Sequence, residues 1–238
     1  MRLYVIGTGS SGNAYLLARD DGRALLLDAG VNIKRIEQAI YTSRLHVEAC
    51  LVTHEHGDHA KAVRDLTKLG IKCYGTPGTA SIVHGVIPFP LHSVKLFAGF
   101  LVMPVPVNHD AMEPCAFLFT DPDTMEKMIY ATDTYFLTNK YPGLNYWLIE
   151  CNYCEEMLTE DTPPILAKRL STSHMSLKRL CDVFRANDLS RCRKIILCHI
   201  SHDRGDPEMM RRRIRDQTGK NVEIARAGTA HELALNPF

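Results

Sequence analysis

The segment LVTHEHGDHA, residues 51–60, constrains what this chain can fold into more than any other part of it. An apolar run leads directly into His54, His56, Asp58 and His59. A packed core gains nothing from such a group, because burying unpaired polar side chains is costly. Imidazole and carboxylate are good ligands for zinc and related cations, so the segment predicts a metal-binding loop after a strand. His54 and His56 can point to one ion, whereas Asp58 and His59 can turn to a second.

Three further residues follow apolar runs in the same way. They are His109 after 101–107, Asp133 after 128–132 and His199 after 194–198. Taken singly, each is more often a hydrogen-bonded residue at the end of a strand. Their common location, in a chain that also carries the first cluster, favours metal ligands.

Short apolar runs alternate with helical patterns along the chain. We expect strands at Arg2–Ile6, Ala14–Ala18, Ala24–Asp28, Ala49–Thr53, Lys72–Gly75, Leu101–Val107, Cys115–Thr120, Met128–Thr132, Tyr146–Glu150 and Lys194–Cys198. We expect helices at Asn32–Tyr41, Ala60–Leu69, Ser176–Asn187 and Asp206–Thr218. This order indicates an α/β fold with a sheet core and helices on its outer faces. No repeat or long linker interrupts it, so residues 1–238 are expected to form a single domain.

Composition narrows the classes of partner. Lys and Arg number 28 and Asp and Glu 27, which excludes a strongly basic nucleic-acid-coating protein but not a local basic groove. We expect no membrane partner and a cytoplasmic location, because no apolar run approaches the roughly 18 residues of a span and no signal-peptide core is present. The pair Cys151 and Cys154 is interpreted as buried structural thiols, since no second CxxC follows at zinc-ribbon spacing.

In this order along the chain, these motifs resemble the metallo-β-lactamase superfamily. The matching residues are Asp28, His54, His56, Asp58, His59, His109, Asp133 and His199. The resemblance implies a four-layer αββα sandwich with two divalent metal ions, zinc or manganese, and a bridging hydroxide as nucleophile. It implies His54, His56 and His109 on one ion, Asp58, His59 and His199 on the other, and Asp133 between them. Asp28 would steady the ligand loop from behind.

Three motifs bear on the substrate. The turn GTGSSGN, residues 7–13, resembles a loop near the metals of phosphodiesterase branches, which implies phosphate contacts from Ser10, Ser11 and Asn13. On local pattern alone this stretch is a tight turn.

His174 on its own would be a surface-loop histidine. Its segment, however, resembles the HST motif of transfer-RNA 3′-processing enzymes and a motif of YycJ/WalJ-like proteins. There the matching histidine lies beside the scissile phosphate, which implies that His174 protonates the leaving oxygen. Glu150 resembles the glutamate that partners that histidine, so we expect a Glu150–His174 dyad. The expected catalytic residues are His174, Glu150 and the ligand Asp58.

The resemblance therefore favours phosphodiester hydrolysis, either of a nucleic-acid end by a YycJ/WalJ-like exonuclease or of a nucleotide. The alternatives are a 3′,5′-cyclic nucleotide phosphodiesterase similar to phage anti-Pycsar enzymes, a glyoxalase II-like thioesterase, and a non-catalytic metal-binding regulator. Related phosphodiesterases are often homodimers, which is the ground for expecting one here. The basic run 211–213, with Arg215, is interpreted as a solvated helix face rather than a nucleic-acid or dimer contact.

Overall fold

The structure is a computed structural model that describes residues 1–158 and 162–233. The chain forms two compact units, which are described separately. Unit 1 comprises Met1–Pro106, Ala111–Met125 and Arg226–Phe238, and unit 2 comprises Val107–Asp110 and Glu126–Ala225. The prediction of a single domain stays a prediction.

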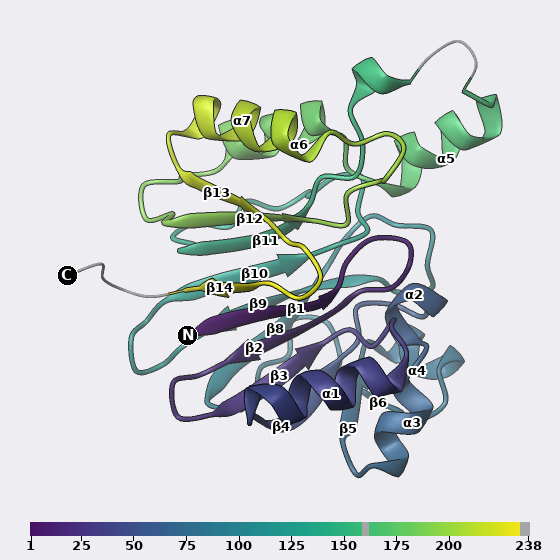
Figure 1. The fold of residues 1–238 in the computed structure, drawn as a ribbon, viewed down its shortest axis with the longest axis vertical. Helices are drawn as coiled ribbons and strands as arrows, with labels where there is room; N and C mark the ends of the chain where they lie inside the picture. Colours follow the sequence, from purple (N-terminus) through teal and green to yellow (C-terminus); the bar gives the residue numbers. More distant parts are fainter. Residues whose placement is uncertain (159–161, 234–238) are drawn as a thin grey trace. The chain divides into compact units, whose positions relative to one another are not determined.

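Unit 1 contains a mixed sheet of seven strands in the order β14-β1-β2-β3-β4-β5-β6 (Figure 1). The strands are β1 (Arg2–Gly7), β2 (Ala14–Ala18), β3 (Arg23–Leu27), β4 (His46–Leu51), β5 (Lys72–Gly75), β6 (Val86–Pro88) and β14 (Ala230–Glu232). Strands β1 to β3 form an antiparallel meander, and β4 to β6 continue in parallel from β3. Because β3 and β4 are parallel, their carboxyl ends lie at one edge of the sheet.

Four helices accompany this sheet: α1 (Ile33–Ser43), α2 (Gly57–Ala60), α3 (Val63–Lys68) and α4 (Pro77–Ile82). Ile36 of α1 and Leu66 of α3 are fully buried in one cluster with Leu26 of β3. Removing such side chains from water supplies the main drive for packing helix on sheet. Unit 1 also holds a second, antiparallel group of strands, β7 (Lys95–Phe97), β8 (Phe100–Pro106) and β9 (Cys115–Thr120).

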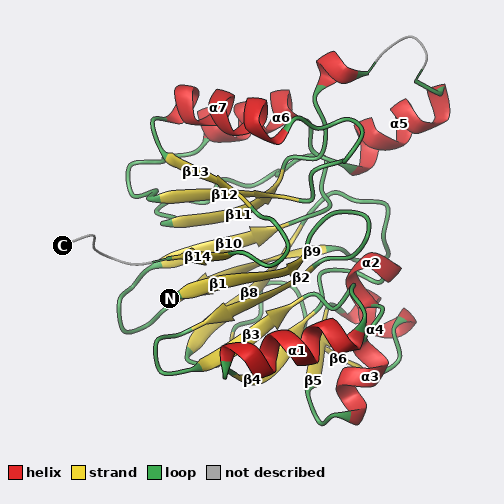
Figure 2. Cartoon of the chain, viewed as in Figure 1, coloured by secondary structure: helices red, strands yellow, loops and turns green. Residues whose placement is uncertain are grey.

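Unit 2 is built on four parallel strands in the order β10-β11-β12-β13 (Figure 2). Their bounds are β10 (Lys127–Ala131), β11 (Tyr146–Glu150), β12 (Lys194–Cys198) and β13 (Asn221–Ile224). The other elements are η1 (Glu155–Met157), α5 (Pro164–Ser173), α6 (Leu177–Ala186) and α7 (Pro207–Thr218). Helices α6 and α7 lie on one face of the sheet, where Phe184 meets the buried Trp147 edge to face at 5.4 Å. Because the strands are parallel, the residues that follow β10, β11 and β12 gather at one edge.

Most predicted elements are confirmed, and β2, β5, β9, β11 and β12 have the predicted bounds. The helix expected at Ala60–Leu69 is wrong as one element, because it is divided into α2 and α3. Ala62 is the cause: its N–H donates to the carbonyl of Ala29, 2.8 Å away in another loop, instead of continuing a helical ladder. Helices α4, α5 and η1 and strands β6, β7, β13 and β14 were not expected. Among the described residues, no helix combines the length and apolarity that crossing a bilayer requires.

Candidate metal centre

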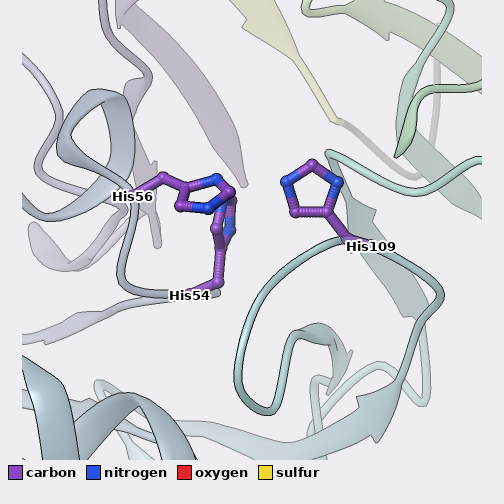
Figure 3. A group of neighbouring side chains, drawn as sticks. All are labelled: His54, His56 and His109. Carbon is purple, nitrogen blue, oxygen red and sulfur yellow. The ribbon is translucent and has the colours of Figure 1, made fainter. Parts of the chain in front are cut away.

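In unit 1 the predicted ligand loop follows β4. His54 and His59 are buried, and His56 and Asp58 are half-buried. The rings of His54 and His56 lie next to one another (Figure 3) and meet edge to face. Their centroids are 4.7 Å apart. The ring of His59 is 4.2 Å from that of His54. The loop thus brings three imidazoles together.

Asp28 supports this loop from the end of β3. Its buried carboxylate accepts the backbone N–H of Thr53 at 2.8 Å and the Thr53 hydroxyl at 3.0 Å. It also lies 2.7 Å from Nδ1 of His59. Because a carboxylate can only accept, Nδ1 of His59 carries the hydrogen and Nε2 carries the lone pair. Asp28 therefore orients the ring in the manner typical of residues behind a metal ligand.

Asn13 of the Gly/Ser loop fixes the same ring from the other side. Its side chain is fully buried, and its amide nitrogen lies 3.1 Å from Nε2 of His59. Its Oδ1 accepts the N–H of Gly9 at 3.0 Å. Ser10 and Ser11, by contrast, are exposed. The structure thus places the serines at the surface and Asn13 inside, where it contacts the protein's own groups.

Two glycines let these loops approach one another. A Cβ on Gly30 would lie 1.6 Å from the carbonyl oxygen of Asp58, and a Cβ on Gly12 would lie 2.4 Å from the carbonyl oxygen of Gly30. Only residues without a side chain fit there. The Gly/Ser loop, the Asp28 loop and the ligand loop therefore pack backbone to backbone.

In unit 2 the predicted ligands follow different strands. His109 lies in the short segment after β8, and its Nδ1 donates to the carbonyl of Ser173 at 2.8 Å. Its other nitrogen, Nε2, is 3.8 Å from Oδ2 of Asp133, which follows β10. His199, after β12, has Nδ1 3.0 Å from Oδ1 of Asp133. The sheet edge thus assembles residues that are far apart in the sequence.

Glu150, the buried last residue of β11, connects this group. Its Oε1 is 2.6 Å from Nδ1 of His174 and 2.9 Å from Nδ1 of His199. Its Oε2 accepts the N–H groups of Thr134 at 2.9 Å and Met175 at 3.0 Å. Four donors on one buried carboxylate keep it ionised and fix its position.

Charge and burial shift the pKa values of this group. Burial lowers the pKa of His109. Burial also opposes the charged form of His174, but the carboxylates of Glu150 and Asp133 outweigh it and raise its pKa. For Glu150, burial is likewise outweighed, by His174 and His199, and its pKa is lowered. Both shifts favour the charged forms of His174 and Glu150.

Three site residues share an uncommon backbone conformation. Asp28, Asp133 and His199 have positive φ values of 56°, 42° and 51°. Left-handed conformations are unfavourable for residues with a Cβ, and they recur at functional sites. Each of these residues lies within two residues of the end of a strand, so the left-handed turn directs the chain out of the sheet at the site.

The donor set fits divalent cations. Nδ1 of His59, His109 and His199 each faces a protein oxygen that can only accept, so Nε2 is the nitrogen through which each would bind a metal. Asp133, Glu150, His174 and His199 each offer an atom within 4.8 Å of the others, which makes unit 2 rich in such donors. Zinc and related divalent metal ions accept a combination of histidine and carboxylate ligands.

Thr53 was not among the predicted site residues. Its hydroxyl lies 3.0 Å from both Asp28 and Nδ1 of His54 and so connects the support of the loop with a candidate ligand. The available signal was a hydroxyl directly before the first histidine at the end of an apolar strand.

Comparisons with known proteins agree with this geometry. Residues 7–81 match the family model described as the metallo-beta-lactamase superfamily. The chain is similar to the exodeoxyribonuclease YycJ of Bacillus anthracis, with 29% identity across 87% of this chain and 85% of the relative.

Two solved structures share the fold. The metallo-beta-lactamase fold protein YhfI of Bacillus subtilis has a TM-score of 0.71 and 17% identity, and the match covers 97% of this chain and 98% of that one. A diphosphatase from the PhnP family has a TM-score of 0.71 and 18% identity, with 98% of both chains covered. The predicted α/β class and αββα sandwich are thereby confirmed.

Proposed function

Since the chain carries a metallo-β-lactamase domain and is a hydrolase of that superfamily, we propose that it is a dinuclear-metal phosphodiesterase that cleaves a nucleic-acid end. His54, His56 and His109 would hold one ion and Asp58, His59 and His199 the other, with Asp133 shared. Zinc or manganese suits this mixed nitrogen and oxygen set. Two bound cations would supply hydroxide at neutral pH and stabilise the charge that develops on phosphate oxygens.

The contact between Glu150 and His174 carries the proposal. Oε1 of Glu150, 2.6 Å from Nδ1, directs the opposite ring nitrogen, Nε2, away from the carboxylate. The raised pKa of His174 supplies a proton near neutral pH, which a departing sugar oxygen needs. A thioester has a thiol leaving group that departs readily as thiolate, so this acid would be superfluous there.

Similarity supports a nucleic-acid end as the substrate. The relative from Bacillus anthracis is named an exodeoxyribonuclease and resembles this chain over most of its length. The exposed hydroxyls of Ser10 and Ser11 stand on the loop that packs against the ligand loop, and they would contact a phosphate. Asn13 would act on phosphate only through the ring of His59 that it holds.

The test is a panel of substrates with purified protein and zinc or manganese. The panel holds a 5′-labelled single-stranded DNA, 3′,5′-cyclic mononucleotides, bis(p-nitrophenyl) phosphate and S-lactoylglutathione. His56→Ala is the control for metal dependence, with metal content measured in parallel. We expect two ions per chain and stepwise shortening of the DNA that the variant loses.

Other outcomes identify the alternatives. Preference for a cyclic mononucleotide would replace the exonuclease by a cyclic nucleotide phosphodiesterase. Cleavage of the thioester alone would overturn phosphodiester chemistry. Two bound ions without cleavage of any substrate would indicate a regulator.

A further inference from the structure

A short aromatic segment follows the candidate ligand Asp133 in unit 2. Tyr135 is half-buried, and Phe136 is 41% exposed. A single exposed apolar side chain ordinarily needs no explanation. This one comes three residues after a buried carboxylate that would bind metal, so its surroundings matter.

The backbone that presents Phe136 is firmly held. The N–H of Tyr135 donates to the carbonyl of Asn108 at 3.0 Å. The carbonyl of Phe136 accepts both the side-chain amide of Asn108 at 3.1 Å and the hydroxyl of Thr134 at 2.8 Å. Thr134 is in turn bonded through its N–H to Glu150. Phe136 is therefore fixed to Asn108, the residue before His109, and through Thr134 to Glu150, which contacts His174.

A cation lies against the neighbouring ring. The guanidinium of Arg179 sits over the ring of Tyr135, 5.3 Å from its centroid, and donates to the carbonyl of Ser171 at 2.5 Å. Ser171 is three residues before His174 in the sequence. Within residues 1–158 and 162–233, Arg179 makes no ion pair with a carboxylate under 4 Å. The structure thus holds a positive charge in place without neutralising it.

We propose that Phe136 and Arg179 form a nucleotide subsite: the ring of Phe136 stacks on the base beside the cleaved phosphodiester, and Arg179 contacts the next phosphate along the strand. The inference rests on the proposed function and deepens it. Aromatic rings accept every base, because each base has a π-face, and a fixed cation attracts the backbone irrespective of sequence. Because of this subsite, the enzyme would prefer a strand that carries bases to a phosphodiester without bases, and it would show no preference for one base sequence.

Cleavage of two matched strands tests the subsite. One 5′-labelled strand carries normal nucleotides at the cleaved end, and the other carries abasic tetrahydrofuran residues there. We expect the ratio of kcat/KM for the two strands to fall about tenfold in Phe136→Ala, mainly through KM, given the strength of base–aromatic stacking. Phe136→Trp should retain the ratio, and Phe136→Leu, which keeps apolar bulk without a π-face, should not. Tyr41→Ala, which removes an exposed aromatic ring from α1, is the matched control.

A binding measurement separates this inference from the proposed function. A strand that ends in 2-aminopurine, titrated with His174→Ala protein, should lose fluorescence on stacking, and adding Phe136→Ala should abolish the loss. In the same titration Arg179→Gln should reduce the slope of log Kd against log salt by about 0.7, the value for one phosphate of a single strand.

The outcomes are distinct. Equal cleavage of normal and abasic strands would overturn the subsite and leave the phosphodiesterase intact. Failure to cleave any phosphodiester would overturn the proposed function. Binding without quenching would overturn the subsite whether or not cleavage is seen.

Discussion

The two units supply their candidate ligands in different ways. In unit 1 the candidate ligands lie in one loop after β4, and their support, the carboxylate of Asp28, contacts that loop and the residue before it. In unit 2 they come from separate strand ends, and Glu150 joins His199, a candidate ligand, to His174, the proposed acid. Under the proposed function, the loop of unit 1 would only hold metal, whereas unit 2 would couple metal binding to proton transfer.

This difference predicts unequal effects of neutralising the two supporting carboxylates. Glu150→Gln keeps the shape of the side chain but removes the charge that holds His174 protonated. Burial would then dominate, and the pKa of His174 would fall. Activity that needs the protonated ring is lost as pH rises through that pKa, so the alkaline limb of kcat should move to lower pH. At neutral pH we expect kcat to fall about 10²- to 10⁴-fold, the usual contribution of general acid catalysis.

The double variant with His174→Ala checks that the two residues act together. The combined loss should be close to that of the larger single loss, because residues that act as a unit are not additive. Normal kcat in Glu150→Gln with normal metal content would discard the dyad.

The corresponding change in unit 1 should act on metal affinity. In Asp28→Asn the new amide places a donor among donors from Thr53 and His59, so the ring of His59 loses its orientation. We expect metal affinity to fall about 10- to 100-fold, as for other residues behind metal ligands. Titrating the variant with metal should restore kcat at saturation. If kcat stays low when both ions are bound, Asp28 takes part in more than holding the loop.

The same contrast explains what the sequence could predict. The cluster from His54 to His59 is contiguous, so its chemistry can be interpreted without knowing the fold. His109, Asp133 and His199 were identified because each follows an apolar run in the sequence. For Asp133 and His199, the parallel strands β10 and β12 bring these ends to one edge of the sheet. What their side chains contact could not be predicted, because Ser173 and Glu150 reach them through tertiary packing.

The local sequence pattern was also insufficient to predict structure at positions where tertiary contacts determine the conformation. The expected helix 60–69 is interrupted because the N–H of Ala62 bonds to Ala29. Asn13 was expected to contact phosphate. Its side chain is instead buried, 3.1 Å from His59, and a Gly/Ser-rich turn in the sequence gives no sign of that position. The two shortest unexpected strands of the first sheet, β6 and β14, have three residues each and too little sequence for a period to be recognised.

Two glycines near the ligand loop of unit 1 differ in how much space surrounds them. Gly30→Ala would force a Cβ onto the carbonyl of Asp58, whereas a Cβ on Gly57, inside the ligand loop, meets nothing within 4 Å. We expect Gly30→Ala to lower the free energy of unfolding by about 1–3 kcal/mol, the usual cost of overpacking, and to reduce metal binding. Gly57→Ala should change neither, as urea unfolding and metal titration would show. Equal effects of both variants would mean that flexibility, rather than close packing, matters at these positions.

The smallest effect is expected from the arginines of α7 in unit 2. Arg211 pairs with Glu208, Arg213 with Glu156 at 2.7 Å and Arg215 with Asp216, so their charges are already neutralised by carboxylates. Changing all three to Gln should alter cleavage of single-stranded DNA by less than about twofold and leave its salt dependence unchanged, because no counterion release is lost. Arg179, which has no such carboxylate partner among the described residues, should behave differently in the same assay. A large loss of DNA cleavage in the α7 variant would mean that the nucleic acid binds along α7, and it would contradict binding of the strand at Arg179.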